Sequence, residues 1–416
     1  MAKQNKPAIR FKGFTDAWEQ RKLGEMGQTY TGLSGKTKDD FGHGRARFVT
    51  YMNVFSNPIS NPEMTEPIEI DPKQNEVEVG DVFFTTSSET PEEVGMSSIL
   101  LEKRGKTYLN SFCFGFRPSE KIDSYYLAYM LRSESARAKI TLLAQGISRY
   151  NISKNKVMEI AVSLPSLDEQ KMIGQYFSQL DHLITLHQRK YDKLQVLKKA
   201  MLEKMFPKNG SSVPEIRFKG FTDAWEQRKL GEVVERITRK NENLESTLPL
   251  TISAQYGLIN QNEFFDKRIA SKDVSGYFLV RNGEFAYNKS TSSDAPWGAI
   301  KRLDSYESGV LSTLYIVFKI LDERKTSSDY IVTYYNTDLW HKGIQAIAAE
   351  GARNHGLLNV APADFFETNL TMPKDYAEQQ QIGSFFQQLD HLITLHQREL
   401  EKLQNIKKSM LEKMFV

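Results

Sequence analysis

IRFKGFTDAWEQRKLGE occurs twice in this chain of 416 residues, at 9–25 and again at 216–232. Seventeen identical residues do not recur by chance, so the chain is an internal duplication with a period of about 208 residues. Two shorter repeats follow the same spacing: QLDHLITLHQR at 179–189 and 388–398, and MLEKMF from Met201 and Met410. Because the period is far longer than that of solenoid repeats, each copy is expected to be a domain followed by a connector.

Between the shared blocks, residues 26–165 and 233–373 agree in pattern rather than in sequence. Two pairs of segments predict matching strands: residues 80–84 (GDVFF) with 283–287 (GEFAY), each after a turn, and the β-branched or aromatic runs Tyr108–Phe116 with Leu311–Ile320. The loops after the first pair differ, TTSS in one copy and NKST in the other. A shared scaffold with different loops is expected of two modules that bind two different targets. Neutral drift in two structural domains is the alternative.

A long helix is predicted after each variable region. Ser166 and Glu169 have capping-box spacing, and Asp375 and Glu378 repeat it. Apolar residues then recur with heptad spacing, which predicts a coiled coil. The predicted seam contains Ile173, Phe177, Leu180, Ile184 and Leu194 in the first copy and Ile382, Phe386, Leu389, Ile393 and Leu403 in the second. His187 and His396 also fall in this seam, where an amphipathic packing role is favoured over a metal or pH-sensing site.

The predicted fold class is α+β, with two domains of mixed strands and helices separated by two long helices. Duplicated halves tend to be related by a pseudo-two-fold axis, so the helices are expected to form an antiparallel coiled coil. The same relation places the C-terminal residues near Ile9. The expected boundaries are 1–166 for the first recognition domain, 167–206 for the first helix, 207–373 for the linker and second recognition domain, and 374–416 for the second helix.

Composition argues for a binding protein of the cytoplasm. The chain is 40% hydrophobic and 26% charged, begins with the polar MAKQNKPAIR, has no apolar run of membrane-spanning length and has one cysteine, Cys113. The net charge of +3 does not by itself indicate nucleic acid. No phosphate-binding loop, dinucleotide fingerprint, HExxH helix or zinc-ribbon cluster is present. We therefore expect no catalytic residue, no metal site and no cofactor in this chain.

Positive charge is concentrated between Ser135 and Lys156, where five basic residues stand without an acidic one. The segment Gln145–Asn151 (QGISRYN) lies within it and combines glycine, which permits close backbone approach, with side chains that pair with base edges. An ordinary solvated loop is the alternative. With the divergent loops, the candidate DNA-binding residues are Thr85, Thr86, Ser87, Ser88, Gln145, Ser148, Arg149, Tyr150 and Asn151 in the first copy, and Asn288, Lys289, Ser290, Thr291, Arg353, Asn354 and His355 in the second.

The layout resembles the specificity subunits of type I restriction–modification enzymes over nearly the whole chain. The resemblance is carried by the IRFKGFTDAWEQRKLGE block, the Gly80-Asp81 strand entry, and the Pro-x-x-x-Glu-Gln-x-x-Ile element. That element comprises Pro165, Glu169, Gln170 and Ile173, and, with one residue more after the proline, Pro373, Glu378, Gln379 and Ile382.

The resemblance implies a non-catalytic subunit that recognises a bipartite target in double-stranded DNA. It also implies two methyltransferase subunits, which use S-adenosylmethionine, and two restriction subunits, which use ATP and Mg²⁺. Two other classes are weighed against this one. A coiled-coil scaffold whose domains bind protein or carbohydrate would show no sequence-specific DNA binding, and a single-chain methyltransferase would need catalytic motifs that are absent here.

Overall fold

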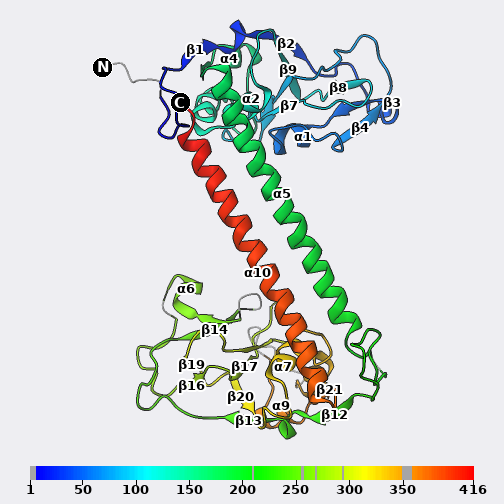
Figure 1. The fold of residues 1–416 in the computed structure, drawn as a ribbon, viewed down its shortest axis with the longest axis vertical. Coiled ribbons are helices and arrows are strands. Elements are labelled where there is room, and N and C mark those ends of the chain that lie inside the picture. The colour runs from blue at the N-terminus through cyan, green and yellow to red at the C-terminus, as the bar shows by residue number, and fades with distance from the viewer. Residues whose placement is uncertain (1–5, 209, 254–256, 268, 293–294, 349–357) are drawn as a thin grey trace. The chain divides into compact units, whose positions relative to one another are not determined.

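The chain folds as two compact units, each built from both copies of the repeat. The computed structural model describes residues 6–208, 210–253, 257–267, 269–292, 295–348 and 358–416. Unit 1 comprises Met1–Arg189 and Gln397–Val416, and unit 2 comprises Lys190–His396. Each unit therefore holds one variable domain, the start of the helix that follows it and the end of the other long helix (Figure 1).

Unit 1 is organised around a four-stranded antiparallel sheet in the order β2-β9-β5-β7, with a three-stranded sheet β4-β3-β8 and the pairs β1-β11 and β6-β10. Its strands are β1 Glu19–Lys22, β2 Gly27–Thr31, β3 Phe41–Val49, β4 Thr65–Ile68, β5 Val82–Thr85, β6 Ser87–Ser88, β7 Ser97–Ile99, β8 Thr107–Leu109, β9 Cys113–Pro118, β10 Tyr150–Asn151 and β11 Ala161–Leu164. Its shorter helices are α1 Tyr51–Ser56, α2 Ser124–Met130, α3 Glu134–Thr141 and α4 Lys154–Met158.

Unit 2 repeats the central sheet in the order β13-β20-β17-β18 and adds the pairs β12-β21, β14-β15 and β16-β19. Its strands are β12 Glu226–Lys229, β13 Val234–Ile237, β14 Leu250–Ser253, β15 Gly257–Asn260, β16 Phe278–Arg281, β17 Phe285–Asn288, β18 Ala299–Arg302, β19 Ser308–Leu311, β20 Ile316–Ile320 and β21 Asn369–Met372. Its shorter helices are α6 Gln261–Phe265, α7 Ser328–Tyr334, α8 His341–Ile347 and α9 Pro362–Phe366.

The two long helices are antiparallel within each unit. They are α5 Leu167–Lys204 and α10 Tyr376–Lys413. In unit 1, Phe415 stacks on Phe177 with ring centroids 5.6 Å apart, and Lys407 Nζ lies 2.5 Å from Asp181 Oδ1. Unit 2 has the corresponding contacts, Phe206 with Phe386 and Lys198 with Asp390. In each unit, higher residue numbers on α5 contact lower residue numbers on α10, so the two helices run antiparallel. The predicted fold class is therefore confirmed.

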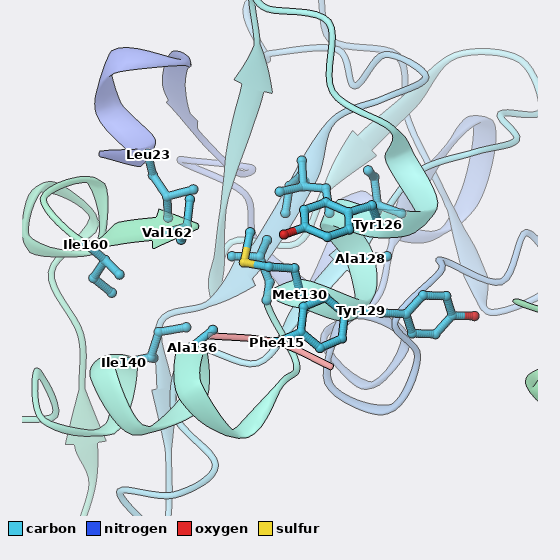
Figure 2. Packing of buried hydrophobic residues seen from close by; sticks show 14 of the residues in the cluster. Leu23, Tyr126, Ala128, Tyr129, Met130, Ala136, Ile140, Ile160, Val162 and Phe415 are labelled. Carbon is cyan, nitrogen blue, oxygen red and sulfur yellow. The ribbon is translucent and has the colours of Figure 1, made fainter. Parts of the chain in front are cut away.

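The end of α10 completes the core of unit 1. Phe415 is buried against Tyr126 of α2, with ring centroids 5.7 Å apart, in the hydrophobic cluster that also contains Met130 and Ala136 (Figure 2). Ile9 N also donates to Lys413 O at 3.0 Å, as expected from the pseudo-symmetry. The predicted seam residues Ile173 and Phe177 lie in this same core, so they pack against their own domain as well as against α10.

The strand predictions hold at the first matched pair and only in part at the second. Gly80 and Gly283 have φ of +98° and +84°, and each precedes a central strand, β5 or β17. Tyr108–Phe116, however, is divided between β8 and β9 by a turn in which Cys113 N donates to Asn110 O at 3.1 Å. Leu311–Ile320 is divided in the same way after Ser312. Asparagine and serine side chains favour such turns, and the apolar flanks conceal them in the sequence.

Candidate nucleic-acid interface

The two candidate segments of the first copy lie side by side in unit 1. β6 and β10 pair antiparallel, with Tyr150 opposite Ser88 and Asn151 opposite Ser87. Ile152 N then donates to Thr86 O at 2.9 Å, which continues the connection. Segments about 60 residues apart in sequence are thus joined by backbone hydrogen bonds.

The second segment is a tight hairpin, called here hairpin 145–151. Gln145 N donates to Asn151 O at 3.0 Å, and Asn151 N donates to Gln145 O at 2.8 Å. At the turn, Gly146 has a φ of +147°, and a Cβ at this position would lie 2.0 Å from Arg149 O. The hairpin therefore requires glycine here, because no side chain fits against the returning strand.

Arg149 is held above the junction of the two segments. Its Nη2 donates to Ser87 Oγ at 3.2 Å, and its guanidinium carbon lies 5.9 Å from the centroid of the Phe112 ring. A guanidinium over an aromatic face is attracted by the ring quadrupole. Arg149 is consequently a positioned side chain with donors left over, suited to a base edge or a phosphate.

An open depression of about 710 Å³ adjoins the hairpin. Its lining comes from α1, the segment after β5 and the hairpin: Tyr51, Met52, Phe55, Ser87, Ser88, Glu89, Thr90, Glu93, Ser148 and Arg149. Tyr51 OH donates to Ser87 O at 2.7 Å, and Ser88 Oγ donates to Glu93 Oε2 at 3.1 Å. Six of these residues were not predicted, since aromatic residues four apart, such as Tyr51 and Phe55, are equally typical of a helix face in a core.

Thr85 does not belong to this surface, so its prediction as a DNA-binding residue is wrong. It is fully buried at the end of β5, opposite Cys113 of β9, and its Oγ1 accepts from Met96 N at 3.0 Å. Ser87 and Ser88 are also largely buried, but they line the depression and offer part of their surface there.

The basic cluster of the sequence divides into structural and exposed residues. Arg137 donates hydrogen bonds to the backbone carbonyls of Glu92, Val94 and Gly95. Burial lowers the pKa of Arg137 to about 10. Lys139 Nζ donates to Ala161 O. Arg137 is half-buried and thus fixes the segment that carries Glu93 toward the depression.

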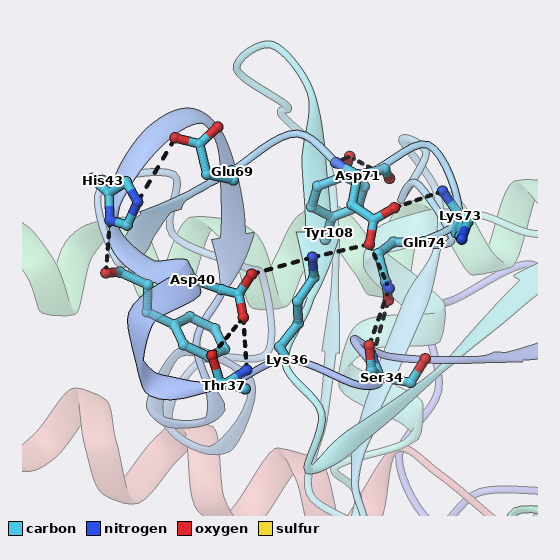
Figure 3. A network of polar contacts seen from close by, with 11 residues as sticks. Ser34, Lys36, Thr37, Asp40, His43, Glu69, Asp71, Lys73, Gln74 and Tyr108 are labelled. Carbon is cyan, nitrogen blue, oxygen red and sulfur yellow. Dashed lines mark hydrogen bonds and ion pairs between the residues drawn. The ribbon is translucent and has the colours of Figure 1, made fainter.

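Charged residues in the loops beside the small sheet β4-β3-β8 are paired with each other. Lys36 Nζ lies between Asp71 and Asp40, 2.9 Å and 3.7 Å away (Figure 3). The Lys36 ammonium and hydrogen bonds from Lys73 and Gln74 lower the pKa of Asp71 well below its usual range. This pairing makes Lys36 a weaker candidate for anion binding than Arg149.

In unit 2, the loop after β17 takes the corresponding place. Lys289 is half-buried and its carbonyl accepts from Leu358 N at 2.9 Å, the counterpart of the Thr86–Ile152 bond in unit 1. Asn288 ends β17, Ser290 is exposed, and Thr291 is half-buried. Arg353, Asn354 and His355 lie outside the described residues.

The Glu-Gln elements join each long helix to its domain. Glu169 is fully buried and accepts two hydrogen bonds from Arg10, at 2.6 and 2.7 Å; Glu378 accepts the same pair from Arg217. The capping-box prediction is therefore half wrong. Ser166 Oγ accepts from Glu169 N, but the Glu169 carboxylate binds Arg10 instead of its own cap.

The neighbouring glutamines fix the domain against the helix. Gln170 Oε1 accepts from Asp123 N at 3.0 Å, and its Nε2 donates to Pro165 O at 2.9 Å. Gln379 makes the matching bonds to Ser327 and Pro373. This element is therefore part of the scaffold that positions the candidate interface, not part of the interface.

Within the described ranges, no three His, Cys, Asp or Glu side chains are grouped as a metal ion would need. None of the described helices is both long enough and apolar enough to cross a membrane.

Sequence comparison identifies part of the chain and two relatives. Residues 15–196 match the family described as "Type I restriction modification DNA specificity domain". The putative type I restriction enzyme MjaX specificity subunit of Methanocaldococcus jannaschii is 26% identical over 195 residues, 46% of either chain. The MjaVIII specificity subunit of the same organism is 31% identical over 141 residues, 33% of this chain and 32% of that one. The matches thus span less than half the length of these relatives.

The fold comparison covers the whole chain. The crystal structure of a type I restriction–modification system S subunit from M. genitalium is similar with a TM-score of 0.63 at 14% identity, over 99% of both chains. Such a likeness concerns the fold and includes both variable domains and both long helices. Residues 15–196 are therefore similar in sequence to this family of DNA specificity domains, and the chain as a whole shares its fold with the M. genitalium S subunit.

Proposed function

We propose that this chain is the DNA-specificity subunit of a type I restriction–modification complex and has no catalytic activity of its own. The observation that carries the proposal is the convergence of β6 and hairpin 145–151, where Arg149 is held with donors free for DNA. Phosphate contacts would supply affinity and base-edge contacts specificity.

The duplication supports a bipartite target. The central sheets of the two units have the same strand order, while the loops after β5 and β17 differ in sequence. Each unit would bind one half-site. Joining two such binders raises the affinity through effective concentration and makes binding depend on the spacing of the half-sites.

The long helices support two equivalent partner sites. Leu183 and Leu186 are 42% and 38% exposed on α5, and their counterparts Leu392 and Leu395 are 41% and 46% exposed on α10. These four residues are called here the leucine pairs. Identical apolar pairs left open on both helices suit two copies of one partner, which we take to be methyltransferase subunits. S-adenosylmethionine would bind there, and ATP and Mg²⁺ in two restriction subunits.

Selection from random duplexes tests the DNA-binding function. We expect the full chain to enrich a split sequence of two short blocks with a fixed unspecific spacer. Replacing residues 26–165 with the same region of a related chain should change one block only. Enrichment of no sequence would contradict the proposal, and a change in both blocks would contradict the assignment of one half-site to each unit.

Labelled methyl transfer tests the absence of catalysis. Methyl groups should reach DNA when a methyltransferase subunit is added and not with the isolated chain. Methylation by the isolated, homogeneous chain would show that it is an enzyme.

A further inference from the structure

Ile147 is exposed to a degree that folding does not explain. Its side chain is 96% exposed, the highest value among the large apolar side chains of the described ranges. A side chain equally open to water in the folded and unfolded states adds no hydrophobic stabilisation. Turn positions of this kind usually hold glycine, asparagine, aspartate or serine, so β-branched isoleucine is not explained by turn chemistry either.

The hairpin presents Ile147 on a fixed backbone. Ile147 follows Gly146, whose conformation leaves no room for a Cβ, and the segments on either side of the turn are joined by the two Gln145–Asn151 hydrogen bonds. Pairing of β10 with β6 and the Ile152–Thr86 bond attach the hairpin to the domain. The apolar tip is therefore held in place before any partner arrives.

The surroundings of the tip favour DNA as that partner. Arg149, two residues along, carries a positioned guanidinium, and no acidic residue occurs in the sequence from Ser135 to Lys156. Glu89 and Glu93 line the adjoining depression, where Glu93 accepts a hydrogen bond from Ser88. A two-stranded ribbon fits the major groove of B-DNA. The apolar group that a base pair presents there is the C5 methyl of thymine.

We propose that Ile147 contacts a thymine methyl in the major groove of the half-site bound by unit 1. This inference rests on the proposed function and adds one specificity-determining residue and one base to it. Arg149 would bind a neighbouring base edge or phosphate from the same hairpin, so that one short segment supplies an apolar and a polar contact.

Uracil substitution tests the contact at a single methyl group. The probe is the duplex that the full chain selects, with each thymine of the first half-site replaced in turn by uracil. For the unaltered chain, one replacement should weaken binding about four-fold, as expected when one methyl-sized group returns to water. Ile147→Ala should weaken binding to the unmodified duplex to a similar degree and should lose the sensitivity to that uracil.

Val79→Ala is the matched control. Val79 is 62% exposed and precedes β5, at the opposite end of that strand from Ser87. Its substitution should leave both the affinity and the uracil effect unchanged. Equal melting temperatures of the two variants and the unaltered chain would exclude a folding effect.

Three results would overturn the inference while the proposed function stands: a first half-site without thymine on either strand, no uracil position that weakens binding, or a uracil effect that persists in Ile147→Ala. Weakened methyltransferase binding by Ile147→Ala with unchanged DNA binding would likewise overturn it, in favour of a protein contact. Selection of no sequence by the unaltered chain would instead contradict the proposed function itself.

Discussion

Arg10 and Arg217 show how one residue type supports each unit. Each binds a buried glutamate at the start of a long helix, with a second nitrogen-to-oxygen hydrogen bond of 2.7 Å in both units. The sequence did not predict these two ion pairs, because each glutamate lies about 160 residues from its arginine. The local spacing predicted a helix-capping role for the glutamates instead. Local patterns identify candidates for short-range bonds, and tertiary packing decides which bond forms.

The buried pair makes a prediction about stability. Glu169→Ala leaves the Arg10 guanidinium buried without its carboxylate, so we expect it to lower the opening free energy of unit 1 by about 3 kcal/mol. Native-state hydrogen exchange of β1 and β11 measures this quantity. The control is Glu159→Ala, which removes the exposed Lys22–Glu159 pair and should change little. Equal protection in both variants would show that the buried pair does not hold the unit together.

Arg149 makes a prediction about DNA recognition. Because Ser87 and Phe112 restrict its guanidinium, we expect a directional base contact rather than a mobile phosphate contact. Arg149→Ala should cost about 1–3 kcal/mol on the cognate duplex and relax one target position, with the salt dependence nearly unchanged. Titrations on cognate and single-mismatch duplexes at several salt concentrations provide the measurement.

Arg104→Ala is the control for that experiment. Arg104 is exposed in unit 1 and already paired with Glu63 and Glu102, so its loss should leave specificity unaltered. A uniform loss of affinity for all duplexes by Arg149→Ala, with a salt slope lower by about one, would instead assign Arg149 to a phosphate.

At the scale of elements, the repeats predicted the helices better than the interface. The heptads placed α5 and α10 within a few residues of their ends, because a 38-residue amphipathic pattern averages over local exceptions. Interface residues are predicted one by one, without a long repeating pattern to compensate for a local exception. β5 lies between β9 and β7 and is buried along its length, so Thr85 at its end is buried as well. At the edge of the sheet, the same residue would be exposed. Strand order, which sequence pattern does not contain, decides this.

The leucine pairs make a prediction about assembly. Leu183→Lys with Leu186→Lys should remove one methyltransferase site, because a lysine ammonium is costly to bury against an apolar partner. The same changes at Leu392 and Leu395 should remove the other, and all four together both. Analytical ultracentrifugation should then give two bound subunits for the unaltered chain, one for either double variant and none for the quadruple variant.

Val196→Lys is the control for assembly. Val196 is 70% exposed on α5, but its counterpart in α10 is Asn405, so it does not belong to a repeated pair. Its substitution should leave two subunits bound. An unchanged stoichiometry in the leucine variants would mean that the partner binds elsewhere.

At the scale of the whole chain, each long helix ends in the same local arrangement. Ile216 N donates to Lys204 O at 2.9 Å, and Ile9 N donates to Lys413 O at 3.0 Å. Residues 205–215 make the eleven-residue connection in the first case. Three residues follow Lys413 and eight precede Ile9, so joining the termini would create a second connection of eleven residues.

This equivalence predicts that the chain tolerates circular permutation. Joining residue 416 to residue 1 and reopening at Gly210, an exposed residue of the first connection, cuts the turn in which Ser211 N donates to Lys208 O, but it keeps the Ile216–Lys204 and Ile9–Lys413 bonds. We expect the permuted chain to keep its melting temperature and to select the same split sequence, since close termini commonly permit such rearrangement. Reopening between Phe83 and Phe84, inside the buried strand β5, should abolish folding of unit 1. Loss of one half-site by the Gly210 permutant would mean that the natural linker contributes more than a connection, and the two connections would then not be equivalent.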